Sequence, residues 1–209
     1  MPPSARLSPR KFFALKAALF AASLLPAAVV VAALFFSDNP PAEPVDFLTR
    51  ETGESALRFL IITLAMTPLR LLTGRQGPLQ LRRMFGLFAF FYAACHFSVY
   101  LFLDLQLDFS LAWDDVVKRK YITVGAAALL LLIPLAATSN QFSVKKMGFA
   151  AWQKLHRAVY AISVFGAVHF LWLKKGEDIG EPLAYLFIIL LLLATRPPPM
   201  QKLLRRARR

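Results

Sequence analysis

The sequence predicts an all-α integral membrane protein with six transmembrane helices in one bundle and both termini in the cytoplasm. Three observations support this fold class. Of the 209 residues, 57% are hydrophobic and 18% are charged, six long segments are almost free of charge, and basic and acidic residues fall in alternate connections. Soluble domains are about 45–50% apolar and about 25% charged. The composition therefore disfavours a soluble enzyme and excludes a disordered chain.

Six segments have the length and apolar character of membrane-spanning helices. About 20 apolar residues, each rising about 1.5 Å, cross roughly 30 Å of hydrocarbon. The segments are 12–36, 55–72, 84–103, 121–137, 151–173 and 182–195, the last being the shortest. Pro182 suits the first turn of a helix, and Arg196 followed by three prolines ends that helix. The predicted organisation is a basic arm over 1–11, a bundle over 12–196 and a basic tail over 197–209.

The first segment has the charged start and apolar run of a secretory signal peptide. The apolar region of a signal peptide is usually about 7–15 residues long, and this run is longer. We therefore expect a retained transmembrane helix here.

Charge is segregated along the chain. Eighteen of the 25 basic residues, and no acidic residue, lie in the N-terminal arm, in the connections after the second and fourth predicted helices with their flanks, and in the tail. The other seven basic residues and all 12 acidic residues lie in the remaining three connections. Because Lys and Arg concentrate in cytoplasmic loops, this pattern predicts the orientation. The net charge of +13 thus indicates membrane topology and affinity for anionic headgroups, and not nucleic-acid binding.

The connection over residues 104–120 carries apolar residues at alternate positions: Leu105, Leu107, Phe109, Leu111 and Trp113. This pattern predicts an extended amphipathic strip, lying on the membrane surface or against a partner protein. Packing on the membrane surface is the simpler interpretation.

All three histidines fall in predicted spans: His96 in the third, and His156 and His169 in the fifth. Ionisable residues inside a bilayer are costly and usually functional, and imidazole is the usual protein ligand of b-type haem. A single membrane histidine can also be a hydrogen-bonded packing residue. Cys95 is the single cysteine, which excludes an internal disulfide, an iron–sulfur cluster and a C-x-x-C-H haem attachment.

Depth along straight helices selects a pair. His96 lies about 18 Å, His169 about 27 Å and His156 about 8 Å from the cytoplasmic ends of their helices. His96 and His169 are therefore the predicted axial ligands of one haem. His156, about 20 Å and about 140° away from His169, could anchor a second haem, contact a quinone or have a structural role. Phe97, Tyr160, Gly166 and Phe170 are candidates to line a macrocycle or simply to pack.

Two other classes of function remain open. A small transporter would need polar residues along its path, and no acidic residue falls inside a predicted span. For a structural membrane scaffold, the placement of the histidines would be accidental. No strand followed by G-x-G-x-x-G indicates a nucleotide-binding domain.

Four stretches of the chain resemble the MsrQ (YedZ) family, within the wider ferric-reductase-like transmembrane group. They are TLAMTPLR, RRMFGLFAFFYAACHFSVYLFLDL, KRKYITVGAAALLLLIPLAATS and KLHRAVYAISVFGAVHFLWLKK, spread over residues 50–196. One departure is Lys120, where the family pattern has a proline.

This resemblance implies a haem-binding subunit in the bacterial inner membrane. The subunit would pass electrons from the quinone pool to a periplasmic molybdopterin-containing methionine sulfoxide reductase, which would itself carry out the chemistry on oxidised envelope proteins. The resemblance further implies b-type haem on His96 and His169, His156 as another family histidine, and FMN at a site not located in the sequence. The alternative within this group is a ferric-reductase-like electron carrier fed by a separate flavin reductase.

Overall fold

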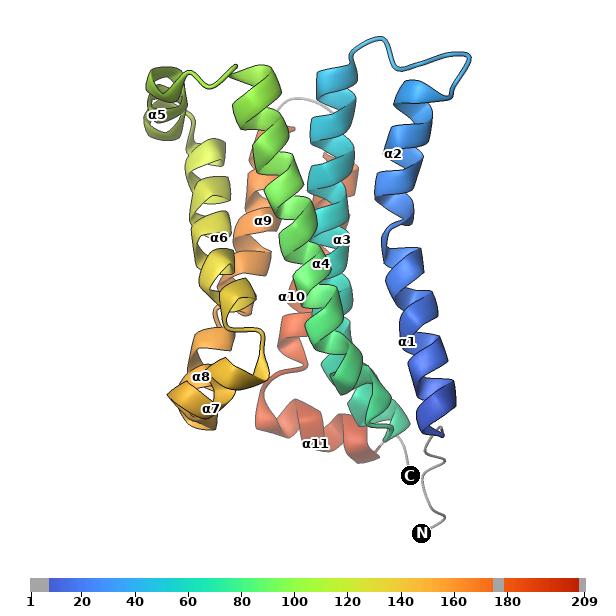
Figure 1. Cartoon of the computed structure of the whole chain (residues 1–209). Helices are drawn as coiled ribbons and strands as arrows, with labels where there is room; N and C mark the ends of the chain where they lie inside the picture. The colour runs from blue at the N-terminus through green and yellow to red at the C-terminus, as the bar shows by residue number, and fades with distance from the viewer. Residues whose placement is uncertain (1–7, 175–178, 207–209) are drawn as a thin grey trace.

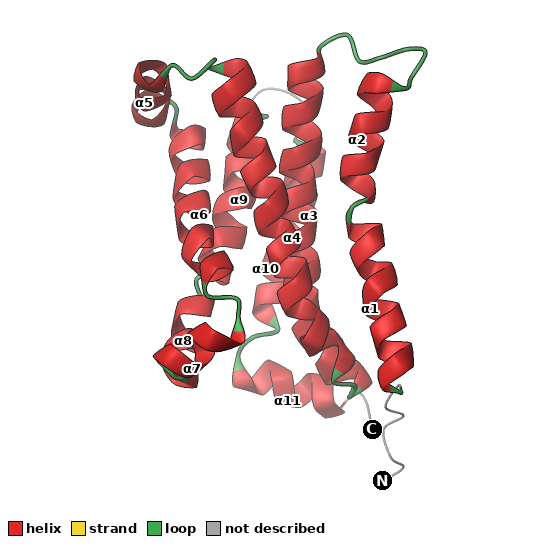
Figure 2. Cartoon of the chain, viewed as in Figure 1, coloured by secondary structure: helices red, strands yellow, loops and turns green. Residues whose placement is uncertain are grey.

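The computed structural model describes residues 8–174 and 179–206, and every regular element in these ranges is a helix (Figure 1, Figure 2). Long helices run side by side, and short helices lie at both ends of the bundle. We call the end that carries α7, α8, α11 and the start of α1 the basic end, and the opposite end, which carries α5, the acidic end (Figure 1). The predicted all-α class is confirmed.

The first predicted span consists of α1 (Pro9–Ser23) and α2 (Leu25–Phe35), separated at Leu24. Pro26 has no N–H, so the helical ladder is interrupted there. The hydroxyl of Tyr92, from α4, bridges the gap: it donates to the Ser23 carbonyl at 2.8 Å and accepts from the Ala27 N–H at 3.3 Å. These are the two groups that a regular helix would pair with each other. The first span is therefore tied into the bundle by a specific polar contact.

The central pair of helices is α3 (Pro44–Thr73) and α4 (Gly77–Val99), with η1 (Tyr100–Asp104) continuing α4 as a π-helical turn. Stacked rings join the pair, with the ring of Phe59 lying 5.4 Å from Tyr92 and 5.5 Å from Phe88. The α3 helix begins well before the predicted residue 55, because Pro44 starts it and charged residues occupy its first turns at the acidic end. Gly74, in the left-handed region at φ 68°, ends it.

The predicted extended strip over residues 104–120 is wrong. After a turn in which Gln106 and Leu107 have positive φ, the chain forms α5 (Phe109–Lys118). The Asp108 side chain starts this helix by accepting a hydrogen bond from the Leu111 N–H at 2.9 Å. The exposed residues Phe109, Trp113 and Val117 recur every four positions, so the apolar pattern has the helical period and not the strand period.

The second half of the chain begins with α6 (Lys120–Ala137) and the short α7 (Gln141–Met147). The predicted fifth span is divided into α8 (Phe149–His156) and α9 (Val159–Leu173). At this break the Ala158 N–H bonds to the Leu155 carbonyl at 3.0 Å, three residues back, which is a 3₁₀-type turn. His156 and His169 therefore lie on two helices and not on the single straight helix assumed in the depth argument.

The chain ends with α10 (Gly180–Ala194) and α11 (Pro198–Arg206), which is bent 87° away from α10. In the described residues, four helices are long and apolar enough to cross a membrane: Pro9–Phe35, Pro44–Thr73, Gly77–Asp104 and Lys120–Ala137. A fifth is added if α10 and α11 count as one span. The 15-residue helices α9 and α10 are about 22 Å long but run within the bundle (Figure 1). The chain is a membrane protein, while six spans remain a prediction.

The described termini lie at the same end of the bundle (Figure 1). The basic connections after α3 and α6 are also at this end, and the loop over residues 36–43 is at the acidic end with α5. Several charges used in the topology prediction lie outside the described residues, namely Arg6, Lys175, Glu177, Asp178, Arg208 and Arg209. The orientation in the membrane remains a prediction.

Candidate functional site

Two of the three histidines face each other between α4 and α9, toward the acidic end of the bundle. The ring centroids of His96 and His169 are 6.0 Å apart, and the ring planes are inclined by 83°. Both side chains are partly buried. The structure thus brings together the two histidines that the sequence pairs by depth.

Each of these imidazoles is oriented by a main-chain carbonyl of a neighbouring helix. Nδ1 of His96 lies 2.9 Å from the Thr49 carbonyl oxygen of α3, and Nδ1 of His169 lies 2.7 Å from the Tyr121 carbonyl oxygen of α6. A carbonyl can only accept, so we assign the proton of each neutral ring to Nδ1. Both Nε2 atoms are then unprotonated and available as metal ligands, an arrangement common to metal-binding histidines.

Glycines make room for both rings. A Cβ atom at Gly53 would lie 3.0 Å from Nδ1 of His96, and one at Gly125 would lie 2.7 Å from Nδ1 of His169. Each glycine stands four residues, or about one helical turn, after the residue whose carbonyl its histidine contacts. The two histidines are therefore accommodated in the same way. Neither glycine is among the site residues predicted from the sequence. The available signal was a glycine inside an apolar helix, which commonly has a packing reason.

The pair suits a metal held between two imidazoles. Metal–imidazole bonds are about 2.0–2.1 Å long, so two rings on opposite sides of one ion have centroids roughly 6 Å apart. In the described part of the chain, no group of three or more His, Cys, Asp and Glu side chains is arranged to hold a metal ion. Among the described residues, the ligands available to a metal at this pair are the two imidazoles. Haem iron meets that condition, because the porphyrin supplies its four equatorial nitrogens.

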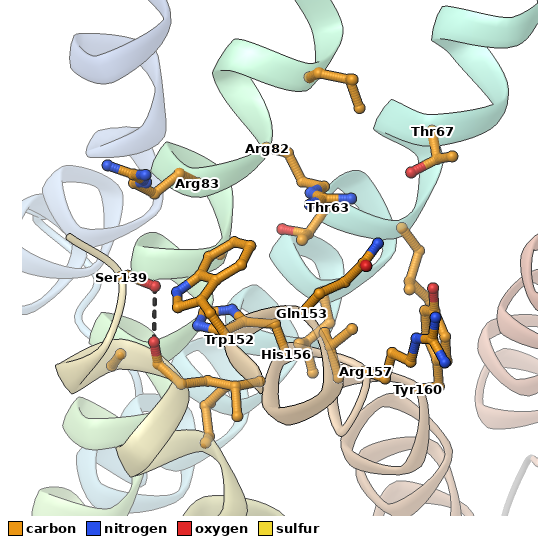
Figure 3. A pocket seen from close by; sticks show the side chains of 18 of the residues that line it. Thr63, Thr67, Arg82, Arg83, Ser139, Trp152, Gln153, His156, Arg157 and Tyr160 are labelled. Carbon is orange, nitrogen blue, oxygen red and sulfur yellow. Dashed lines mark hydrogen bonds between the residues drawn. The ribbon is translucent and has the colours of Figure 1, made fainter. Parts of the chain in front are cut away.

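His156 lies elsewhere, at the basic end. Its ring stacks on Trp152 at a centroid distance of 4.0 Å, and its Nε2 lies 3.0 Å from the hydroxyl oxygen of Thr138. That hydroxyl donates to the Pro134 carbonyl at 2.6 Å, so we assign it as the acceptor of a His156 Nε2–H bond. Trp152 in turn donates to the Thr138 carbonyl at 2.9 Å. His156 borders a pocket at this end, which we call the basic-end pocket (Figure 3).

The aromatic and small residues proposed for a macrocycle have other contacts. A Cβ at Gly166 would meet the Leu57 side chain of α3 at 3.3 Å. Phe170 is buried with its ring edge-on to Tyr185, and Phe97 is 43% exposed. For Gly166 and Phe170, ordinary helix packing is the reading that these contacts favour.

The helical membrane fold and the facing histidine pair are typical of a membrane protein that holds a metal cofactor between its helices. Comparison with known proteins agrees with this class. Residues 52–167, more than half of the chain, match the family described as ferric reductase like transmembrane component. The matched range contains His96 and His156 and ends shortly before His169.

Curated relatives narrow this class. The chain is 45% identical to a protein of Azospira oryzae over 88% of this chain and 78% of the relative. It is 46% identical to one of Herminiimonas arsenicoxydans over 90% and 87%, and 47% identical to one of Bordetella pertussis over 90% and 91%. All three are named protein-methionine-sulfoxide reductase heme-binding subunit MsrQ. The chain belongs to the MsrQ family, which confirms the resemblance seen in the sequence.

Proposed function

We propose that this chain is a transmembrane b-type cytochrome that passes electrons from the respiratory quinone pool to a periplasmic molybdopterin-containing methionine sulfoxide reductase. The observation that carries the proposal is the facing pair His96 and His169, with both Nδ1 atoms on carbonyls. The names of the relatives, heme-binding subunits of protein-methionine-sulfoxide reductases, support the same function.

His96 and His169 would be the axial ligands. The haem would supply one-electron chemistry by cycling its iron between the ferric and ferrous states. The carbonyls of Thr49 and Tyr121 would hold the two rings in their ligating orientation and raise the basicity of Nε2. Gly53 and Gly125 let the rings approach the backbones of α3 and α6.

The proposed topology supports electron delivery toward the periplasm. With the basic end in the cytoplasm and the acidic end in the periplasm, as the positive-inside rule predicts, the histidine pair lies toward the periplasmic side. A haem held at this pair would lie close to a periplasmic partner, in keeping with the proposed location of the chain in the bacterial inner membrane. Repair of methionine sulfoxide would occur on the partner, so this chain would be its electron-transfer subunit.

His156 would have a role at the basic end. To bind the iron of a second haem through Nε2, His156 would have to give up its hydrogen bond to Thr138. To contact a quinone, it could keep that hydrogen bond. We propose the quinone contact as its first role and retain the second haem as the alternative. FMN, implied by the family, is proposed as a further cofactor without assigned residues.

A difference spectrum tests the central claim. The full-length protein, purified in mild detergent, should show a b-type band in the dithionite-reduced minus oxidised spectrum. Well-folded protein without such a band would refute the proposal and favour a transporter or a scaffold. Reduction of the haem by a quinol, compared with reduction by a flavin reductase, would separate the proposed function from a ferric-reductase-like carrier.

A further inference from the structure

The basic-end pocket is a second candidate binding site, separate from the histidine pair. It has a volume of about 220 Å³ and lies among α3, α4, α6, α8 and α9. Four arginines line it, namely Arg82, Arg83, Arg157 and Arg196. Figure 3 shows Arg82 and Arg83 on one helix across the pocket from Trp152, His156 and Arg157.

The positive charge of this pocket is uncompensated within the described residues. No acidic residue lines it, and the ion pairs found in this part of the chain all involve Arg50, Arg58, Lys118 or Arg119, which lie toward the acidic end. Clustered guanidinium groups repel one another unless an anion lies between them. Their planar arrays of N–H donors match the oxygens of phosphate in geometry.

Arg196 is fixed in place by a defect in α3. Pro68 has no N–H, so the Leu64 carbonyl, one turn earlier, lacks its helical partner. Nη2 of Arg196 donates to that carbonyl, and the guanidinium carbon lies 5.4 Å from the centroid of the Tyr160 ring.

Two buried polar atoms at this pocket have no partner. Nε of Arg196 and Oγ1 of Thr67 are inaccessible to solvent and make no hydrogen bond, and both residues line the pocket. Buried polar groups are nearly always paired, so two unpaired donors beside one cavity indicate a missing acceptor. The Nε–H of Arg196 and the hydroxyl of Thr67 can each donate a hydrogen bond to an anion, as can the N–H groups of the other arginines.

We propose that the basic-end pocket binds a phosphate group, carried either by an anionic phospholipid or by a soluble phosphate ester. Pockets for drug-sized ligands are roughly 300–1,000 Å³, so this smaller cavity suits a headgroup-sized fragment. Basic pockets between transmembrane helices on the cytoplasmic side commonly take anionic lipid headgroups. This inference goes beyond the proposed electron transfer. His156 lines the same pocket, so the phosphate group would be bound beside the proposed quinone contact.

The test uses the full-length protein in detergent and in nanodiscs. Binding of phosphatidylglycerol is measured against phosphatidylcholine by native mass spectrometry, and binding of inorganic phosphate by calorimetry. The pocket variant is Arg82→Gln with Arg157→Gln, which leaves the structural Arg196 unchanged. The matched control is Arg75→Gln with Arg205→Gln, which removes the same charge at the same end outside the pocket.

A charged hydrogen bond is worth enough that losing one weakens binding by about tenfold or more. We expect such a loss in the pocket variant and less than about twofold in the control. Preference for phosphatidylglycerol that phosphate does not displace supports a lipid source, and binding or displacement by phosphate supports a soluble one. Equal losses in the two variants, or no binding of either probe to the native chain, would overturn the proposal.

A second variant guards against misfolding. Thr67→Val keeps the shape of the side chain but removes the unpaired hydroxyl, and it should weaken binding severalfold. Normal binding by Thr67→Val together with an unfolded arginine variant would also overturn the proposal. The haem spectrum, recorded on the same samples, should be unchanged by all of these variants, so failure of this inference and failure of the electron-transfer proposal are read separately.

Discussion

Gly125 lies directly against the imidazole of His169, so that a Cβ atom at position 125 would stand 2.7 Å from Nδ1, 3.0 Å from Cε1 and 3.2 Å from Cγ. The ring cannot retreat without losing its 2.7 Å contact with the Tyr121 carbonyl. The helix backbone and the candidate ligand are therefore fitted to each other at this position.

Gly125→Ala should displace His169 and weaken haem binding. Overpacking of this kind costs about 1–3 kcal/mol, which corresponds to roughly 5- to 150-fold weaker binding. Gly53→Ala, whose Cβ would be 3.0 Å from the nearest atom of His96, should have a smaller effect in the same direction. Haem content per folded protein, from the pyridine haemochrome, measures both.

Gly86→Ala is the matched control for these variants. Gly86 lies on α4, as His96 does, but its added Cβ would make only an ordinary contact at 3.8 Å with Thr63. It should keep normal haem content. Equal haem loss at positions 53, 86 and 125 would show that the glycines serve helix packing in general and not the histidine rings.

The histidines themselves should separate into two groups. His96→Ala and His169→Ala should each abolish the b-type band of the haem proposed at the acidic end, because each removes one of the two proposed iron ligands. His156→Ala should leave that band detectable, because His156 contacts Thr138 and Trp152 at the other end. Difference spectra with haem quantification test this. A halved haem content in His156→Ala would favour the second haem, and identical spectra in all three variants would contradict the separation into two sites.

Tyr92→Phe should loosen the first span. The hydroxyl joins the Ala27 N–H and the Ser23 carbonyl, and Tyr92 is only 2% exposed. Without it, the buried Ser23 carbonyl and the partly buried Ala27 N–H lose their partner, which costs about 1–3 kcal/mol. Thermal unfolding in detergent should show the loss.

Ser23→Ala is the control for Tyr92→Phe. It removes a hydroxyl that bonds only to the Leu19 carbonyl of its own helix, and it keeps the Ser23 carbonyl that Tyr92 contacts. It should change stability by less than about 0.5 kcal/mol, as is usual for changes that remove no essential partner. Similar destabilisation by both variants would argue that the region is sensitive to any change and not to the Tyr92 bridge.

The sequence was sufficient for features that depend on composition and spacing. The apolar runs predict the long helices, the segregated charges match the two ends of the bundle, and helical rise alone pairs His96 with His169. Features that depend on local geometry were not predictable in this way. The break between His156 and Val159 contains no proline or glycine that would predict it. The helix α5 was predicted as an extended strip because, over a short window, its apolar residues fit both a strand and a helix.

The contacts of the site required the structure for a different reason. The role of Gly53 and Gly125 can be recognised only once α3 and α6 are seen to pack against the histidines of α4 and α9. The same holds for Arg196, read in the sequence as a residue that ends a helix. It also pairs with a carbonyl that Pro68 frees on α3, 132 residues earlier in the chain. Such long-range complementarity leaves no periodic signal in a single sequence.

The pairing of Arg196 with the Leu64 carbonyl can be tested by a double-mutant cycle. Arg196→Gln should destabilise the protein by about 1–3 kcal/mol, because it leaves that buried carbonyl without a donor. In the Pro68→Ala background, residue 68 regains an N–H that can reach Leu64 within α3, so the same Arg196→Gln change should cost less. Unfolding free energies of the four proteins give a coupling of about 0.5–3 kcal/mol if the arginine substitutes for the missing helical bond. Additive effects of the two changes would show that Arg196 stabilises the basic end through Tyr160 and the pocket alone.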